Sequence, residues 1–218
     1  TLLQTEKTEP FPVVLIGRLN SYAAKAQTWI EDVRPIHQAS AYLPDLLAPL
    51  AGRPARVGLI GDHLMPVSFF EQLRGALPRA EFPRAGDLMI QLRQIKSPGE
   101  LELMERAADI NDAALLEALK RIRIGQTEIA VAGEAEYVAR QMGADFGSAT
   151  VIMSGPNTEY PAWRPSLRAL QPGDFVLVDF NACYEHYCND GGITVLLPGA
   201  RPEQAEALRT AHRVLKEV

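Results

Sequence analysis

The feature that most constrains the fold is a long amphipathic stretch that begins at Ser97. Ser97 can cap a helix, Pro98 suits the first helical position, and Glu100 completes a capping box. Behind this start, apolar residues recur at steps of three, four or seven over about seven turns. They are Leu101, Met104, Ala108, Leu115, Leu119 and Ile122. The pattern predicts one long helix with a buried stripe, and a new domain that begins near Ile95.

The part of the chain before Ile95 has shorter, alternating patterns. β-Branched apolar runs at 13–17 and 56–61 are typical of strands, whereas 42–50 and 65–77 have helical spacing. Alternation of this kind predicts a layered βαβ-type sheet. Many folds contain such a sheet, so this part indicates no particular function.

The part after the long helix combines a second helix with short strands. Thr127 can cap a helix that runs to Met142, and Gly143 can supply a left-handed residue at its end. Beyond Gly147, strand-like runs are separated by Gly, Pro and Asn, which favours antiparallel pairing. The expected strands are 150–153, 175–180, 185–188 and 193–197. A last helix is expected from Pro202.

Composition and charge exclude several classes of protein. A hydrophobic fraction of 47% with 22% charged residues is typical of a globular chain and excludes a disordered, collagenous or disulfide-scaffold protein. No apolar run approaches the roughly 20 residues of a membrane helix. The net charge of −5 gives no basic footprint for nucleic acid. We therefore expect neither a membrane nor a nucleic-acid partner.

The charge is also uneven along the chain. Up to Ile95 there are 10 basic and 9 acidic residues, a net +1, and after it 12 basic and 18 acidic residues, a net −6. The asymmetry changes at the same place as the periodicity. Both signals indicate a domain boundary there.

A carboxylate stands in the middle of an apolar strand pattern at Asp179. The predicted strand 175–180 is otherwise apolar, and an unpaired charge buried there would be costly. Asp190 follows eleven residues later. A hairpin turn centred between Tyr184 and Glu185 would place the two aspartates directly opposite each other, with Cβ atoms about 4.5–5.5 Å apart.

Two carboxylates at that separation repel each other, so either one is protonated or a cation lies between them. Carboxylate oxygens suit Mn, Mg or Zn-type ions, and paired metals about 3.5–4 Å apart recur in hydrolases. The spacing therefore favours a metal site at Asp179 and Asp190. The alternative from the residues alone is structural, with Asp190 as a cap and Asp179 as a turn carboxylate.

Sequence motifs around these aspartates are more specific than the spacing. They are QIKSPGEL at 94–101, GQTE at 125–128, SGPN at 154–157, GDFVLVD at 173–179 and YCND at 187–190. In this order and spacing, the chain resembles the creatinase, prolidase and aminopeptidase P family. The resemblance implies an α+β protein, with the rear part of a creatinase-type α/β N-terminal domain at 1–92. It implies the first half of a pita-bread catalytic domain at 93–218.

The same resemblance implies a function. The family members are metal-dependent hydrolases, similar to Xaa-Pro aminopeptidases and dipeptidases, that cleave the bond before proline in a small peptide or amide substrate. It implies two divalent ions, Mn, Co or Zn, and a homodimer. Two of the family's five ligands fall on Asp179 and Asp190, and the other three, one His and two Glu, are expected beyond Val218. This chain alone is therefore expected to be an inefficient catalyst.

The chain departs from the family pattern near the implied substrate site. Ala162 stands where the family has a His that contacts the substrate or the developing oxyanion. Arg164 and Trp163 are candidate replacements, with a surface role as the alternative. Asn181 stands where Gly is usual, and the arginine usual shortly after Asp190 is absent.

These departures keep two other functions open. One is a creatinase-like hydrolase that acts on a small non-peptide amide or amidine compound. The other is a non-catalytic pita-bread binding protein that has lost its metal ligands. Retention of both aspartates argues against the second.

Histidines and cysteines are the remaining candidates. His186, near the predicted hairpin turn, is a candidate catalytic residue, whereas His37 and His63 read as surface residues. Cys183 and Cys188 read as small, reduced packing residues, with a single disulfide as the alternative. Reduced cysteines suit the cytosol, so a cytoplasmic location is predicted.

Overall fold

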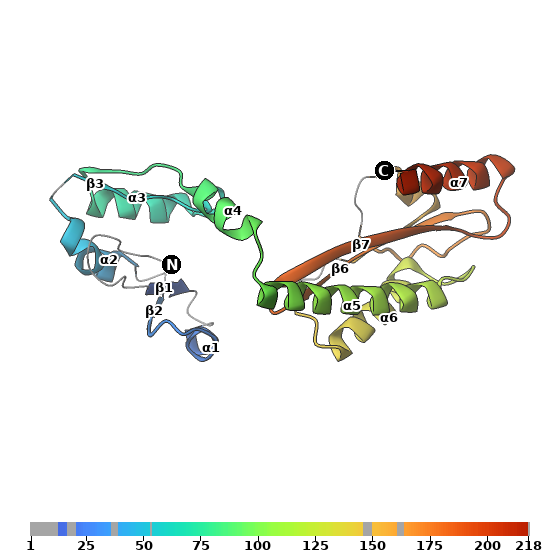
Figure 1. Cartoon of the computed structure of the whole chain (residues 1–218), viewed down its shortest axis with the longest axis horizontal. Helices are drawn as coiled ribbons and strands as arrows, with labels where there is room; N and C mark the ends of the chain where they lie inside the picture. Colours follow the sequence, from blue (N-terminus) through green and yellow to red (C-terminus); the bar gives the residue numbers. More distant parts are fainter. Residues whose placement is uncertain are drawn as a thin grey trace. The chain divides into compact units, whose positions relative to one another are not determined.

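The computed structural model describes residues 13–16, 21–35, 39–52, 54–145, 150–160 and 164–217. The chain divides after Ile95 into two compact units, residues 1–95 and 96–218 (Figure 1). Each unit has its own hydrophobic core.

The first unit opens with a parallel pair of strands. β1 (Val13–Ile16) pairs with β2 (Asp32–Pro35), and α1 (Ser21–Gln27) lies between them in sequence. The next element is α2 (Ala39–Leu47), which carries Pro44 inside it and continues into a short 3-10 turn. A strand, a helix and a second parallel strand form the βαβ arrangement that the alternating patterns predict.

A second parallel pair completes the first unit. β3 (Ala55–Arg56) pairs with β4 (Ala80–Glu81) around α3 (Val67–Ala76), and α4 (Gly86–Gln94) follows. The predicted strand at 56–61 is thus shorter than expected, with a further isolated parallel bridge from Leu59 to Arg84. The core of the unit is a leucine cluster from α2, α3 and the adjoining loops, made of Leu43, Leu47, Leu59, Leu73 and Leu77.

The predicted long helix is α5 (Pro98–Arg121). Its capping box is present, because the Ser97 hydroxyl accepts a hydrogen bond from the Glu100 backbone N–H and the Glu100 carboxylate accepts one from the Ser97 N–H. The buried face differs from the predicted stripe, and Leu101 is 49% exposed. The fully buried positions are Ala107, Ile110, Asn111, Ala114 and Ala118. Three of these five are alanines, whose small side chains let the helix lie close to its neighbours.

The neighbours of α5 are a second helix and a sheet (Figure 1). α6 (Glu128–Gln141) is capped by Thr127 as predicted, with Gly143 in the left-handed region after it. α5 and α6 pack on each other, and α5 also packs on β6 (Phe175–Tyr184), which carries alternating buried residues. This core includes Ile110, Val131, Ile152, Leu170, Val176, Val178 and Phe180.

The sheet of the second unit has three antiparallel strands in the order β5 (Thr150–Ser154), β6, β7 (Tyr187–Leu196). Antiparallel pairing confirms the prediction, but the two strands predicted at 185–188 and 193–197 form one continuous β7. Gly191 and Gly192 do not break it. A Cβ at Gly191 would lie 2.6 Å from Asn111 Nδ2, so glycine at this position lets β7 run on beneath α5.

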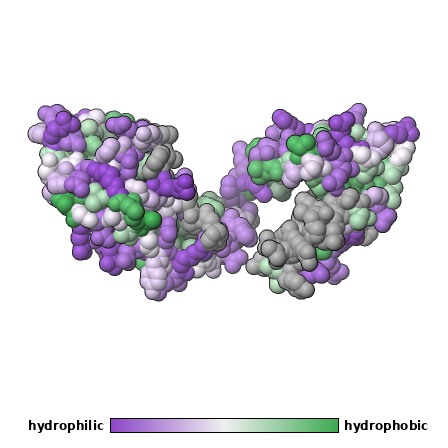
Figure 2. Space-filling model, turned by 180° about the vertical axis from the view of Figure 1, so that it is seen from behind, coloured by the Kyte–Doolittle hydropathy of each residue, from purple (hydrophilic) through white to green (hydrophobic). Residues whose placement is uncertain are grey.

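α7 (Pro202–Glu217) is the last element and contacts β7. Among the residues that the structure describes, no helix has the combination of length and hydropathy needed to cross a bilayer. Seen from behind, the described surface is largely hydrophilic, with apolar side chains gathered in small separate patches (Figure 2).

Candidate metal centre

The centre lies on the hairpin of β6 and β7, and the two-residue turn at its tip determines which residues oppose each other. Glu185 and His186 both have positive φ, 48° and 68°. This is the backbone of a tight primed turn, which suits the twist of the flanking strands. Tyr184 therefore pairs with Tyr187. A turn centred between Tyr184 and Glu185 would instead pair these two residues, so the observed register is shifted by two residues.

The predicted direct opposition of Asp179 and Asp190 is therefore wrong. Asp179 pairs with Gly192, and Asp190 pairs with Asn181. The two aspartates nevertheless share one face, because positions two apart on a strand point the same way. They are diagonal neighbours, a relation that still lets their side chains interact.

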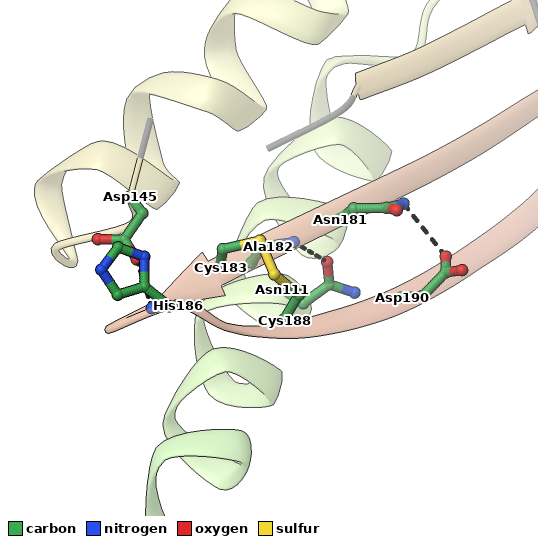
Figure 3. Close-up of a disulfide and its surroundings, with 8 residues drawn as sticks. All are labelled: Asn111, Asp145, Asn181, Ala182, Cys183, His186, Cys188 and Asp190. Carbon is green, nitrogen blue, oxygen red and sulfur yellow. Dashed lines mark hydrogen bonds between the residues drawn. A yellow bond between two sulfur atoms is a disulfide. The ribbon is translucent and has the colours of Figure 1, made fainter. Parts of the chain in front are cut away.

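One amide group links the two carboxylates. The Asn181 Nδ2 donates to Asp179 Oδ1 at 2.9 Å and to Asp190 Oδ1 at 3.1 Å. Figure 3 shows Asn181 and Asp190 reaching toward each other from adjacent strands. The structure thus brings the two predicted ligands to one place, with Asn181 between them.

Burial and charge both act on Asp179. Partial burial raises the pKa of its carboxyl, and the neighbouring Asp190 carboxylate raises the pKa further, whereas the hydrogen bond from Asn181 lowers it. Asp190 is exposed. The two carboxylates therefore repel each other, and a cation bound between them would reduce this repulsion.

The face on which the pair lies is set by packing on the opposite face. Val176, Val178, Phe180 and Ala182 alternate along β6 with the site residues and are fully buried. Asn111 of α5 accepts a hydrogen bond from the Ala182 backbone N–H at 3.2 Å (Figure 3). Helix packing therefore turns the aspartates away from the core.

The donor set fits a hard divalent cation in part. Two carboxylates and a side-chain amide offer oxygen ligands of the kind that Mg²⁺, Mn²⁺ and Ca²⁺ prefer. Within the described part of the chain, no group of three or more His, Cys, Asp and Glu comes together. Asp179 and Asp190 would hold the ion, and these residues alone do not complete a coordination shell.

The reading of Cys183 and Cys188 as reduced packing residues is wrong. They form a disulfide that joins β6 to β7 (Figure 3). The observed register places them directly opposite each other, two positions along the hairpin from the pair of Asn181 and Asp190. The sequence signal was present, because four residues between two cysteines allow a two-residue turn with one closing pair.

Two other sequence candidates of the second unit lie apart from the aspartates. His186 occupies the exposed tip of the hairpin, beyond the disulfide, and its backbone N–H donates to Asp145 Oδ2 at 2.8 Å. Arg164 is exposed, and the structure brings neither His186 nor Arg164 to Asp179. His63, in the first unit, is exposed. Ala162, Trp163 and His37 lie outside the described residues.

A buried carboxylate that the sequence did not single out organises the neighbouring loop. Glu128, the first residue of α6, is fully buried. It accepts hydrogen bonds from the backbone N–H and hydroxyl of Ser154, from the same two groups of Ser166, and from the Asn157 amide. Burial raises the pKa of its carboxyl, but these hydrogen bonds outweigh burial and hold it below the ordinary value.

The same network extends to a partly buried ion pair. Arg168 donates to both oxygens of Asp174, at 2.6 and 3.0 Å, and to the Ser154 hydroxyl at 2.6 Å. A Cβ at Gly155 would lie 2.5 Å from Asp174 Oδ1, so only glycine fits there. Together these contacts fix both ends of the segment 154–168. The sequence gives no signal for the burial of Glu128, because an acidic residue in a first helical turn is ordinary.

Comparison with known proteins gives matches over both units. A family model described as metallopeptidase family M24 matches residues 102–218, and one described as the creatinase/prolidase N-terminal domain matches residues 7–95. The Xaa-Pro dipeptidase of Pyrococcus horikoshii is 32% identical over 146 residues, which cover 66% of this chain and 42% of that protein. The Xaa-Pro dipeptidase of Lactobacillus delbrueckii subsp. lactis is 28% identical over 98% of this chain and 58% of that protein.

Solved structures of prolidases and aminopeptidases are also similar to this chain. The crystal structure of the prolidase from Pyrococcus horikoshii OT3 matches with a TM-score of 0.74 and 28% identity, over 88% of this chain and 53% of that one. The X-Pro aminopeptidase from Thermotoga maritima gives the same values. The chain thus spans about half the length of the relatives that it matches.

Proposed function

Because the chain belongs to metallopeptidase family M24, we propose that the protein is a metal-dependent hydrolase that cleaves Xaa-Pro peptide bonds. The observation that carries the proposal is the pair of carboxylates, Asp179 and Asp190, held together on the open face of the β6–β7 hairpin by one amide. Relatives named Xaa-Pro dipeptidase support the choice of substrate.

The roles of the residues follow from their positions. Asp179 and Asp190 would bind the divalent ions, and the packing of β6 on α5 holds the strand that carries Asp179. Such a centre supplies a metal-activated water and polarises the scissile carbonyl. The Glu128 network would hold the segment that leads to position 162, where the family pattern has a substrate-contacting His. Further ligands, Mn, Co or Zn as the metal, and a homodimer stay predictions. The cytoplasmic location was predicted from reduced cysteines, and the disulfide between Cys183 and Cys188 removes that ground for it.

A second candidate function rests on Ala162. An alanine has no donor for a substrate carbonyl or a developing oxyanion, and this loss favours a creatinase-like hydrolase of a small non-peptide amide or amidine compound. A panel that contains both Xaa-Pro dipeptides and such compounds distinguishes the two candidates. The non-catalytic alternative requires that the carboxylate pair bind no metal.

The metal proposal is tested with the intact protein and its Asp179→Asn and Asp190→Asn variants. Each variant keeps the size of the side chain but removes one negative charge, so we expect bound Mn²⁺ to fall at least tenfold, as does hydrolysis of Xaa-Pro dipeptides. Metal content is measured by elemental analysis after dialysis. Asp112→Asn, at an exposed position of α5, is the matched control and is expected to keep both.

The outcomes separate the parts of the proposal. Unchanged metal content in both site variants would remove the metal centre. Metal binding without release of any N-terminal residue would remove the peptidase activity and leave the second candidate. Rescue of hydrolysis by added Mn²⁺ in the wild type alone supports both parts.

A further inference from the structure

Asn181 lies between the carboxylates of Asp179 and Asp190, whose mutual repulsion a bound cation would reduce. Its side-chain nitrogen Nδ2 donates to both aspartates. Nδ2 lies 2.9 Å from Asp179 Oδ1 and 3.1 Å from Asp190 Oδ1. Asn181 belongs to the same face of β6 as Asp179 and lies directly opposite Asp190 on β7. Within the described part of the chain, Asn181 is the one side chain seen to donate hydrogen bonds to both carboxylates.

The amide of Asn181 carries a donor at one end and an acceptor at the other. With the NH₂ end toward the aspartates, it offsets the repulsion between two negative charges. A cation between the carboxylates would reverse the preference, because the NH₂ hydrogens carry positive partial charge. A half turn about the last side-chain bond brings Oδ1 to the place of Nδ2, with no movement of the backbone. Asparagine carbonyl oxygens are accepted ligands of hard divalent ions.

We propose that Asn181 is a third oxygen ligand of the ion held by Asp179 and Asp190, with its amide turning from NH₂ to Oδ1 as the ion binds. This inference rests on the proposed function, because it needs the carboxylate pair to bind metal. It adds a ligand from a position where the family pattern has a residue without a side chain. The same amide thus holds the carboxylates together before the ion arrives and contributes to its shell afterwards.

The test measures Mn²⁺ affinity by isothermal titration calorimetry in the intact metal-free protein, without reference to activity. Asn181→Ala removes the amide and is expected to weaken Mn²⁺ binding about tenfold. Asn181→Asp keeps an oxygen at the same reach and is expected to bind Mn²⁺ at least as tightly as the wild type. In the absence of metal, Asn181→Asp is expected to melt at a lower temperature, because three carboxylates then meet.

Asn189→Ala is the matched control. Asn189 lies on the same hairpin but pairs with the buried Ala182, so it faces the other side of the sheet. Its Mn²⁺ affinity is expected to equal that of the wild type. Circular dichroism of each metal-free variant shows that the fold is retained.

Each result bears on the inference in one direction. Equal or tighter Mn²⁺ binding by Asn181→Ala overturns it, as does a loss in Asn181→Asp as large as that in Asn181→Ala. An equal loss in Asn189→Ala also overturns it, because the effect would then belong to the strand. If wild-type protein binds no Mn²⁺ at all, the proposed function fails together with the inference. If Mn²⁺ binding depends on the aspartates but not on Asn181, only the inference fails.

Discussion

At the scale of single residues, the second unit contains buried polar groups that are linked to one another by hydrogen bonds. Glu128 is the clearest case, with donors from Ser154, Asn157 and Ser166 around one carboxylate. Each hydrogen bond to a buried charge contributes more than a neutral one. The carboxylate therefore links Ser154, Asn157 and Ser166 to the start of α6.

Glu128→Gln is expected to lower the free energy of unfolding by about 3 kcal/mol, because an NH₂ group would then face donors rather than accept from them. Urea denaturation followed by circular dichroism measures the change. Glu136→Gln, at an exposed position on the same helix, is the control and is expected to change stability by less than about 0.5 kcal/mol. A loss in Glu128→Gln as small as in the control would show that the network adds little.

The same carboxyl gives a pH dependence with a definite sign. Its folded-state pKa lies below the unfolded value of about 4.3. The stabilisation is therefore complete above the unfolded pKa and is lost as the pH falls through the folded pKa. Wild-type protein should lose stability below about pH 4, and Glu128→Gln should show a flatter profile there. Parallel profiles for the two proteins would assign the acid loss to other carboxyls.

At the scale of elements, features that depend on neighbouring residues are predicted correctly from the sequence. Features that depend on residues far apart in the sequence are not. The capping box at Ser97 and the cap at Thr127 are confirmed, because each depends on neighbours within one helical turn. The large apolar residues of α5 predict one buried face. The face that packs on the sheet is instead the one that carries Ala107, Ala114 and Ala118. Which stripe faces the sheet depends on residues such as Gly191, which are far away in sequence.

The hairpin shows the same limit for the candidate site. Asp179 and Asp190 share one face of the sheet, as the sequence predicts, but the strand register differs from the predicted one by two residues. The sequence does not mark this turn, because Glu185-His186 is not one of the Asn-Gly, Asp-Gly or Gly-Gly pairs that signal a two-residue hairpin turn. The sequence does not indicate that Asn181 lies between the two carboxylates, because this position depends on the observed register.

The disulfide of the hairpin gives a prediction at this scale. Cys183→Ser together with Cys188→Ser is expected to lower stability by about 2 kcal/mol, the loop-closure value for so short a loop. Thermal unfolding of the wild type, with and without a dithiol reductant, should reproduce the difference. The double variant should not respond to the reductant. A reductant effect of equal size on both proteins would contradict the assignment.

At the scale of the whole molecule, the sequence predicted the fold class and the family, and both are confirmed. The α+β architecture joins a creatinase-type N-terminal domain to part of an M24 catalytic domain. Five short motifs were enough for this, because their order and spacing are specific. The chain spans about half the length of its relatives, so its activity stays a proposal.

The join between the two units is expected to be the first point of proteolysis. Ile95 is 85% exposed, and Lys96 and Ser97 link α4 to α5 outside both helices. Brief digestion of the intact protein with trypsin should cut after Lys96, as read by mass spectrometry of the new termini. Lys96→Gln should remove this cut. First cuts within α5 or β6 would contradict the division into two compact units.

The disulfide has a consequence for the geometry of the metal site that goes beyond stability. A slip of the hairpin by one residue would carry Asp190 to the other face of the sheet, against α5, and separate it from Asp179. Loops with an even number of residues keep the aspartates on one side, and loops with an odd number divide them. A covalent bond between Cys183 and Cys188 permits only one pairing, so it sets the parity of the hairpin and keeps both carboxylates available to one ion.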